Sequence, residues 1–327
     1  MAGDPSGEDR LIQHYFAPIA THPGALGLSD DAAFIKPPPG CDLVLTTDAI
    51  IAGVHFFAQD SAGEVACKAL RVNLSDLAAK GAKPLGFLLS LALPKDIGDD
   101  WLGRFAEGLR DDAARFSCPL FGGDTVRTGG PIMVSVAMFG SVPEGSMVRR
   151  AGARPGDRVF VSGTIGDAAL GLALRKGATW KPSDAQCQHL SSRYLLPQPR
   201  TALAEAVRLH ASAAMDVSDG LAGDFAKLCR ASGVAADIAA DKVPLSDAAK
   251  TVIAAEPAMR ETALTGGDDY EIVCTIPQAK AASFLQAAQA AQVAVTDIGE
   301  IKTGERVRFL DAADKALSFK HASFSHF

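Results

Sequence analysis

Strand-like and helix-like segments alternate along this chain, and that alternation restricts its fold more than any other feature. The apolar, β-branched segments 42–50, 85–93 and 132–142 predict buried strands. Residues 63–84 and 99–116 have the amphipathic spacing of helices; the first ends near Gly81, and the second begins near an Asp cap. Such alternation is typical of α/β proteins.

The pattern is interrupted near residue 148 by a stretch rich in Gly, Pro and Arg, and it then restarts. Expected strands follow at 158–163, 213–218 and 269–277. Expected helices follow at 167–177, 219–233 and 278–292. A chain of 327 residues commonly forms about two domains, and we therefore expect domains at 1–148 and 149–327.

Composition excludes several classes of protein. Apolar residues make up 48% of the chain, which suffices for a packed core, and the net charge of −6 comes without a basic stripe that would bind nucleic acid. The most apolar stretch, 85–94, is about half as long as a membrane-spanning helix, and the N-terminus lacks the features of a signal peptide. The six cysteines are scattered, as is typical of free thiols in a reducing compartment. We expect a cytoplasmic protein that binds neither nucleic acid nor membranes.

Aspartates recur at the ends of the expected elements, beside glycines and hydroxyl-bearing residues. They are Asp30, Asp31, Asp48, Asp76, Asp124, Asp216 and Asp219. Carboxylates and hydroxyls with space around them suit Mg²⁺, which takes oxygen ligands together with water or substrate phosphates. Their spacing matches neither a zinc cluster nor an EF-hand loop.

Most of these aspartates, taken singly, also have a structural explanation. Asp76 could pair with Lys80 along a helix, Asp124 could follow a glycine turn, and Asp219 could cap a helix. Asp216 is harder to explain in this way, because it ends an apolar strand. The glycine-rich stretch 162–171 could bind phosphate at a helix start, but it lacks a Walker A or dinucleotide motif, which favours a tight strand–helix turn.

Seven segments together resemble thiamine-monophosphate kinase, a family in the superfamily of aminoimidazole ribonucleotide synthetase and selenophosphate synthetase. In chain order they are SDDAAF, LTTDAIIAGVHF, KALRVNLSDLAAKGAKP, FGGDT, RAGARPGD, MDVSDGL and LTGGDDYEI. The resemblance runs from about Asp30 to Phe327. It implies a two-domain PurM-like α/β (α+β) fold, in which the N-terminal domains of a homodimer join their sheets into a β-barrel. The N-terminal domain would bind Mg²⁺ and ATP, and the C-terminal domain would complete the cleft.

The resemblance also implies the residues of the site. Several Mg²⁺ ions would be held by Asp30, Thr46, Thr47, Asp48, Asp76, Asp124, Asp216 and Asp219. ATP would contact Gly123, Asp124, Arg150 and Ser218, and thiamine monophosphate would contact His55, Asp268 and Phe324. The chain departs from the family pattern at Ser29, Asp268 and Ser323, where the family usually has Gly, Glu and Gly.

The implied reaction is direct, Mg²⁺-assisted in-line transfer of phosphate from ATP to thiamine monophosphate, giving thiamine diphosphate. A phosphate monoester has a second pKa near 6, so the acceptor is already ionised and no general base is assigned. Asp48 and Asp216 are expected to be the most critical residues. The alternatives are a superfamily member that uses ATP on another acceptor, and a non-catalytic regulator that binds Mg²⁺ and nucleotide.

Overall fold

The computed structural model describes residues 10–180, 182–321 and 323. The chain divides into two compact units. The first unit contains Met1–Leu77 and Lys83–Gly145, and the second contains Ala78–Ala82 and Ser146–Phe327.

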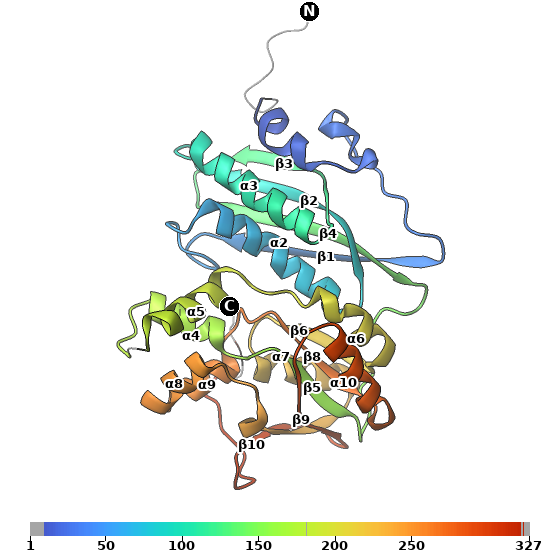
Figure 1. The fold of residues 1–327 in the computed structure, drawn as a ribbon, viewed down its shortest axis with the longest axis vertical. Coiled ribbons are helices and arrows are strands. Elements are labelled where there is room, and N and C mark those ends of the chain that lie inside the picture. Colours follow the sequence, from blue (N-terminus) through green and yellow to red (C-terminus); the bar gives the residue numbers. More distant parts are fainter. Residues whose placement is uncertain (1–9, 181, 322, 324–327) are drawn as a thin grey trace, which may run out of the picture. The chain divides into compact units, whose positions relative to one another are not determined.

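The first unit is built on a four-stranded sheet in the order β1-β4-β2-β3. Strand β4 pairs antiparallel with both β1 and β2, whereas β2 and β3 are parallel. Two long helices lie across one face of this sheet (Figure 1). The elements are β1 (Cys41–Ile51), α2 (Ala62–Ala79), β2 (Lys83–Leu93), α3 (Asp99–Arg115), β3 (Leu120–Arg127) and β4 (Met133–Pro143), preceded by the short helices η1 (Ile12–Phe16), η2 (Ala17–Ile19) and η3 (Pro23–Leu28).

The two faces of this sheet differ in exposure. Val136 and Leu89, which are register partners on β4 and β2, are buried on the helix-covered face. On the opposite face Leu45 is 65% exposed and Leu43 and Val126 are also exposed. Strand side chains alternate between faces, so β1 presents Leu43 and Leu45 on one side and Val44 on the other. The first unit thus has one covered sheet face and one that is largely open.

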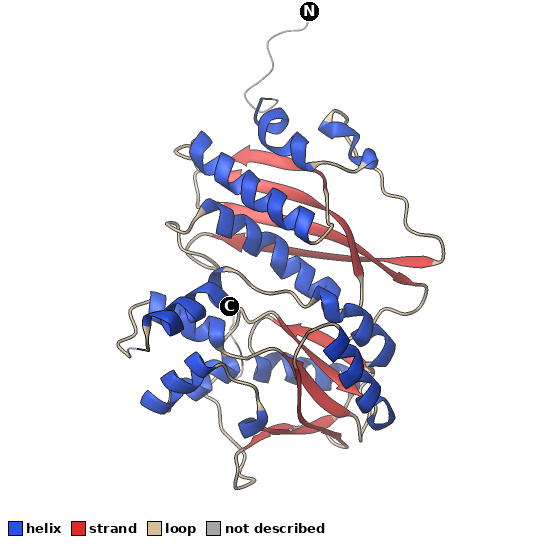
Figure 2. Cartoon of the chain, in the orientation of Figure 1, coloured by secondary structure: helices blue, strands red, loops and turns tan. Residues whose placement is uncertain are grey.

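The second unit contains a six-stranded sheet in the order β10-β7-β9-β5-β8-β6, antiparallel except for the β10–β7 pair. Figure 2 shows its helices arranged around the strands. The strands are β5 (Arg158–Ser162), β6 (Ala213–Val217), β7 (Ala235–Ala239), β8 (Glu271–Ile276), β9 (Val295–Lys302) and β10 (Val307–Leu310); the helices are α4 (Asp167–Arg175), α5 (Asp184–Leu195), α6 (Ala204–His210), α7 (Leu221–Ser232), α8 (Asp247–Ala255), α9 (Met259–Thr265) and α10 (Ala281–Ala290), with the 3₁₀ turns η4 (Thr201–Leu203), η5 (Ala240–Lys242) and η6 (Gln278–Lys280).

Both faces of this sheet are covered, which explains why β5, β6 and β8 are almost continuously buried and largely apolar. Val159 and Val161 of β5 pack in one core with Phe225 of α7. Phe160, between them, packs in the other core with Phe284 of α10. A third apolar cluster joins α4, α5, α8 and α9.

Two local predictions about the first unit were wrong. The segment FGGDT lies in strand β3, not in a glycine turn. Helix α3 begins after Gly98, without a side-chain cap, rather than at an Asp cap.

Candidate functional site

Strand β1 and helix α2 bring one pair of the predicted ligands into direct contact. The Thr46 hydroxyl donates to Asp76 Oδ2 over 2.5 Å. Asp48 is two residues further along β1 and therefore points to the same, helix-covered side of the sheet, whereas Thr47 points to the open side. Thr46, Asp48 and Asp76 thus place oxygen atoms along one edge of the first unit.

Asp30 and Asp124 line a second location in the first unit, a pocket of about 590 Å³ on the open side of the sheet. Asp124 pairs in register with Ser90, whose neighbours Leu89 and Leu91 face the helices, so Asp124 and Asp48 lie on opposite faces of the sheet. A Cβ atom on Gly123 would lie 1.8 Å from the Leu89 carbonyl oxygen. Gly123 is therefore required for strand pairing beside Asp124.

His55 lies in a tight loop between β1 and α2. The backbone N–H of Ile51 donates to His55 Nδ1 over 3.0 Å, and Lys68 Nζ donates to the His55 carbonyl oxygen over 2.9 Å. The ring is half-buried, and its position is set by contacts from both the preceding strand and the following helix.

Asp216 lies in strand β6, and Ser218 and Asp219 lie in the turn between β6 and α7. Asp216 is 7% exposed and pairs in register with Ile272 of β8. Asp219 forms an ion pair with Lys227, with 2.5 Å between Oδ2 and Nζ. Part of the negative charge for which a bound cation was predicted is therefore neutralised by a lysine of the same unit.

The prediction that Asp219 caps helix α7 was wrong. The N-cap residue is Gly220, with φ 119°. The carboxylate of Asp224, one turn into the helix, accepts the backbone N–H groups of Ser218 and Asp219 over 2.9 and 2.8 Å. Burial raises the pKa of Asp224 above its ordinary value, and Lys227 opposes that rise. Asp224 was not among the predicted residues; an acid in the first turn of the expected helix was the available signal.

The segment Gly266–Tyr270 interlocks with this turn. The N–H groups of Asp268 and Tyr270 donate to the carbonyl oxygens of Ser218 and Val217, each over 2.8 Å. Asp268 and Tyr270 adopt left-handed conformations, with φ of 74° and 51°. Residues other than Gly, Asn and Asp are rare in this conformation, so the backbone at Tyr270 is strained and must be held by its surroundings. The contacts bring the predicted residues Ser218 and Asp268 together.

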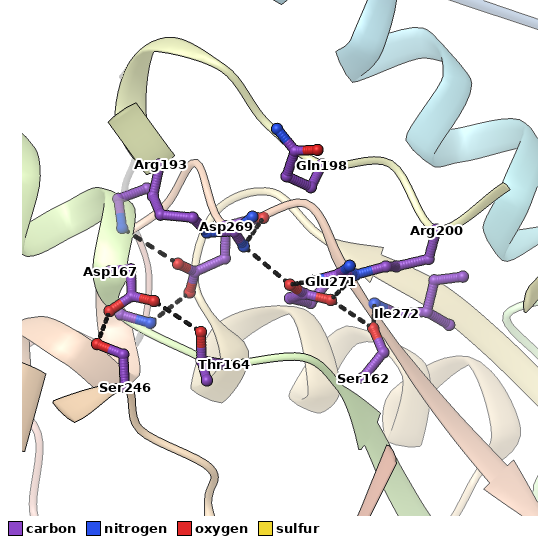
Figure 3. Close-up of polar contacts among 12 residues, drawn as sticks. Ser162, Thr164, Asp167, Arg193, Gln198, Arg200, Ser246, Asp269, Glu271 and Ile272 are labelled. Atoms are coloured by element: carbon purple, nitrogen blue, oxygen red, sulfur yellow. Dashed lines mark hydrogen bonds and ion pairs between the residues drawn. The ribbon is translucent and has the colours of Figure 1, made fainter. Parts of the chain in front are cut away.

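A buried polar network anchors the next strand (Figure 3). Glu271 is fully buried and accepts from Ser162 Oγ at 2.6 Å, Arg193 Nη2 at 2.8 Å, and Arg200 Nε and Nη2 at 2.6 and 2.5 Å. The same Ser162 oxygen accepts the N–H of Ile272 over 2.8 Å. These contacts fix the start of β8, next to Asp216.

Asp269 connects the network to the glycine-rich stretch. Its carboxylate accepts the N–H of Gly166 over 2.7 Å and that of Ala168 over 3.4 Å, at the start of α4. Complete burial raises the pKa of Asp269 well above its ordinary value; the Gly166 N–H and Arg193 oppose that rise, and Asp167 and Glu271 add to it. The stretch 162–171 is therefore a strand–helix turn whose N–H groups bind a carboxylate of the protein itself.

Asp167 is the third buried acid in Figure 3. It accepts from Thr164 and Ser246 and contacts His189 Nε2 over 3.1 Å. Asp167, Asp269 and Glu271 were not among the predicted site residues. The acids of DDYE, which lead into the apolar strand Glu271–Ile276, were the available signal.

Arg150 is exposed and its carbonyl oxygen accepts from Ser232 over 3.3 Å. Lys80, considered as a partner for Asp76, donates to the Ala214 carbonyl oxygen over 2.8 Å. Phe324 lies outside the described residues.

Across residues 10–180, 182–321 and 323, no group of three or more His, Cys, Asp or Glu side chains is arranged to hold a metal ion. No helix in the same ranges has the length and apolar character to cross a bilayer.

Known proteins resemble this chain along most of its length. Residues 29–142 match the N-terminal domain, and residues 154–311 the C-terminal domain, of the AIR synthase related proteins. The thiamine-monophosphate kinase of Caulobacter vibrioides is 46% identical over 290 residues, which cover 87% of this chain and 81% of that protein.

Solved structures agree with these matches. A thiamine-monophosphate kinase from Stenotrophomonas maltophilia K279a has a TM-score of 0.81 at 38% identity, covering 89% of this chain and 91% of that one. AaThiL complexed with AMPPCP and TMP has a TM-score of 0.76 at 34% identity, covering 91% of each chain. The chain belongs to the thiamine-monophosphate kinase family.

Proposed function

We propose that this protein transfers the γ-phosphoryl group of ATP to thiamine monophosphate, producing thiamine diphosphate and ADP. The observation that carries the proposal is its likeness to AaThiL complexed with AMPPCP and TMP over 91% of the chain. In that related structure the ATP analogue stands in for the phosphoryl donor, and TMP is the acceptor of such a transfer. The acceptor phosphate is already largely ionised at neutral pH, so the protein needs no general base to activate it.

The aspartates of both units fit a role in binding Mg²⁺. Asp30 and Asp124 line one pocket, and Thr46 and Asp76 are in contact beside Asp48, so the donors of the first unit are oxygen atoms. Mg²⁺ prefers oxygen donors and usually keeps water or phosphate oxygens in its shell. When bound, Mg²⁺ would reduce the electrostatic repulsion between the two negatively charged phosphate groups. The proposed ligands are Asp30, Thr46, Thr47, Asp48, Asp76, Asp124, Asp216 and Asp219.

Asp219 fits this role less directly than the others. Its Oδ2 atom is 2.5 Å from Lys227 Nζ, and the ammonium group would have to move before a cation could bind there. Lys227 also contacts Asp224 over 2.9 Å, which offers it a second partner when Asp219 is engaged elsewhere.

The other roles follow from the same family assignment. We assign ATP contacts to Gly123, Asp124, Arg150 and Ser218, and contacts with thiamine monophosphate to His55, Asp268 and Phe324. Residues 1–148 would bind Mg²⁺ and ATP and form the dimer, and residues 149–327 would complete the active site. The exposed apolar side chains on the open sheet face, Leu43, Leu45 and Val126, support a homodimer in which two such sheets pack together. Six free cysteines support a reducing, cytoplasmic location.

The proposal is tested with purified protein, ATP, Mg²⁺ and a panel of phosphate-bearing acceptors, measuring ADP and thiamine diphosphate. Thiamine monophosphate should be the preferred acceptor, and omission of Mg²⁺ should abolish turnover. Asp48→Ala and Asp216→Ala should lower kcat strongly while the protein remains folded. ADP release with a different acceptor would identify another ATP-using member of the superfamily. Nucleotide binding without turnover on any acceptor would identify a regulator.

A further inference from the structure

We propose that Lys68 is a positioning residue for the thiamine monophosphate site, holding the His55 loop so that the ring presents its Nε2–H group to an anionic acceptor. This inference rests on the proposed function, because it concerns how one predicted substrate contact is oriented. All the residues involved belong to the first unit.

Lys68 is unusually buried for a lysine. It lies on α2 and is only 1% exposed, among the most deeply buried large side chains in the chain. Lysine is almost never fully buried, because its ammonium group loses its bound water and must form hydrogen bonds within the protein instead. Here Nζ donates to the carbonyl oxygen of His55 over 2.9 Å. One of the hydrogen bonds of this lysine is therefore made to the backbone of a residue that is predicted to contact the substrate.

The loop that carries His55 is closed by its own hydrogen bonds as well. His55 N–H donates to the Ile51 carbonyl oxygen over 2.9 Å, and Gly53 N–H donates to that of Phe56 over 2.7 Å. Gly53 has a φ of 84°, a left-handed conformation that glycine adopts without strain. Phe56, 3% exposed, anchors the end of the loop in the core. Lys68 thus contacts the turn at the residue that precedes its apolar anchor.

The same loop fixes the state of the ring. Ile51 N–H donates to His55 Nδ1 over 3.0 Å, so Nδ1 acts as an acceptor and carries no proton. In a neutral imidazole the proton then resides on Nε2, which becomes a donor. A donor at this position suits a phosphate oxygen, whereas the other tautomer would present an acceptor and repel it. The loop geometry therefore determines which hydrogen-bonding character the ring shows to a ligand.

A substitution that removes the amine but keeps the aliphatic stem tests the role of Lys68. In Lys68→Met the His55 carbonyl oxygen loses a charged donor, and the KM for thiamine monophosphate should rise about tenfold, as expected for one lost hydrogen bond to a charged group. The KM for ATP should change less than about twofold. On a His55→Ala background, Lys68→Met should cause no further rise, because the residue acts through His55. Lys95→Met, at an exposed lysine of the same unit, is the matched control and should leave both KM values unchanged.

The tautomer provides a second measurement that does not depend on activity. Nitrogen-15 NMR of the histidine rings, with His55 assigned by comparison with His55→Ala, should show an unprotonated Nδ1 and a protonated Nε2 in the wild type. Lys68→Met should produce a mixture of tautomers. If that variant does not fold, Lys68→Gln, which keeps a neutral donor on a shorter side chain, is measured in the same way and should show an intermediate shift.

The outcomes separate this inference from the proposed function. A rise in both KM values, an effect that adds to that of His55→Ala, or an unchanged tautomer in Lys68→Met would overturn the positioning role. A wild-type protein that phosphorylates no thiamine monophosphate would overturn the proposed function, and the NMR result would still decide whether Lys68 orients the ring.

Discussion

The buried carboxylate of Glu271 allows a quantitative test of the network that anchors β8. Glu271→Gln preserves the shape of the side chain but removes the negative charge that two arginines share. Glu271 is fully buried, and the side chains of Arg193 and Arg200 are 10% and 24% exposed. Removing one partner of a buried ion pair costs about 3–5 kcal/mol, because the remaining charge is left uncompensated. Since Arg200 is partly reached by water, we expect the lower end, about 3 kcal/mol.

This loss should appear as a fall of roughly 6–12 °C in the melting temperature of the second unit, using 2–4 °C per kcal/mol for a unit of this size. Trp180, which packs against the α4, α5, α8 and α9 cluster, reports on that unit by fluorescence when Trp101 of the first unit is replaced by Phe. Glu305→Gln, at an exposed glutamate of the same unit, is the control.

A double-mutant cycle distinguishes an ion-pair effect from a general packing effect. Arg193→Met combined with Glu271→Gln should cost less than the sum of the two single changes, because the second change removes a charge that the first left unpaired. A Glu271→Gln protein within about 0.5 kcal/mol of the wild type, the range of an ordinary surface substitution, would refute the reasoning.

Three further predictions concern other parts of the site and core. Because burial raises the pKa of Asp269 above its unfolded value near 3.8, its contribution to stability is fully present below that pH and is lost as the pH rises through the folded pKa. Asp269→Asn should therefore gain stability relative to the wild type between pH 4 and pH 8 in denaturant titrations, and parallel curves would contradict this. In Gly267→Ala the new Cβ atom would lie 2.4 Å from the Ser218 carbonyl oxygen, so the free energy of unfolding should fall by about 1–3 kcal/mol. Gly129→Ala, which has open space around the new Cβ atom, should leave the free energy of unfolding unchanged, and equal stability of the two variants would contradict the prediction. Burial raises the pKa values of Cys118 and Cys229 to about 12. Alkylation of the native protein at pH 8, followed by mass spectrometry, should therefore label the half-buried Cys41 and Cys187 first. Early labelling of Cys229 would argue against the described core.

The sequence predicted the main elements of both units because their periodicities are strong. Strands such as β1 and β5 and helices such as α3 and α7 follow closely from apolar spacing. Strand β3 was missed because its two glycines suggest a turn. In the fold, position 123 requires glycine because the Leu89 backbone lies too close for a side chain. The short strands β7 and β10 and the helices α8 and α9 carry too few residues for a clear period.

The site shows a different limit of sequence reasoning. The aspartates were identified from their small neighbours, but their partners depend on distances along the fold. Asp219 meets Lys227 two helical turns away, and Asp268 meets the backbone of Ser218 fifty residues earlier in the chain. Neither contact has a local sequence signal. Asp269, two residues before β8, and Glu271, its first residue, were missed because an acid gives no local indication of which distant groups neutralise it.

The attachment of Asp269 to Gly166, 103 residues away, has a consequence for how such loops are interpreted. A helix start surrounded by glycines is commonly regarded as a receptor for a diffusible anion. In this protein the anion is supplied by the polypeptide, and the glycines make room for neighbouring helices: a Cβ atom on Gly166 would lie 2.4 Å from that of Ala263, and one on Gly171 would lie 2.1 Å from the Leu190 carbonyl oxygen. A nucleotide competing for that position would first have to displace a carboxylate that is covalently tethered and present at very high effective concentration.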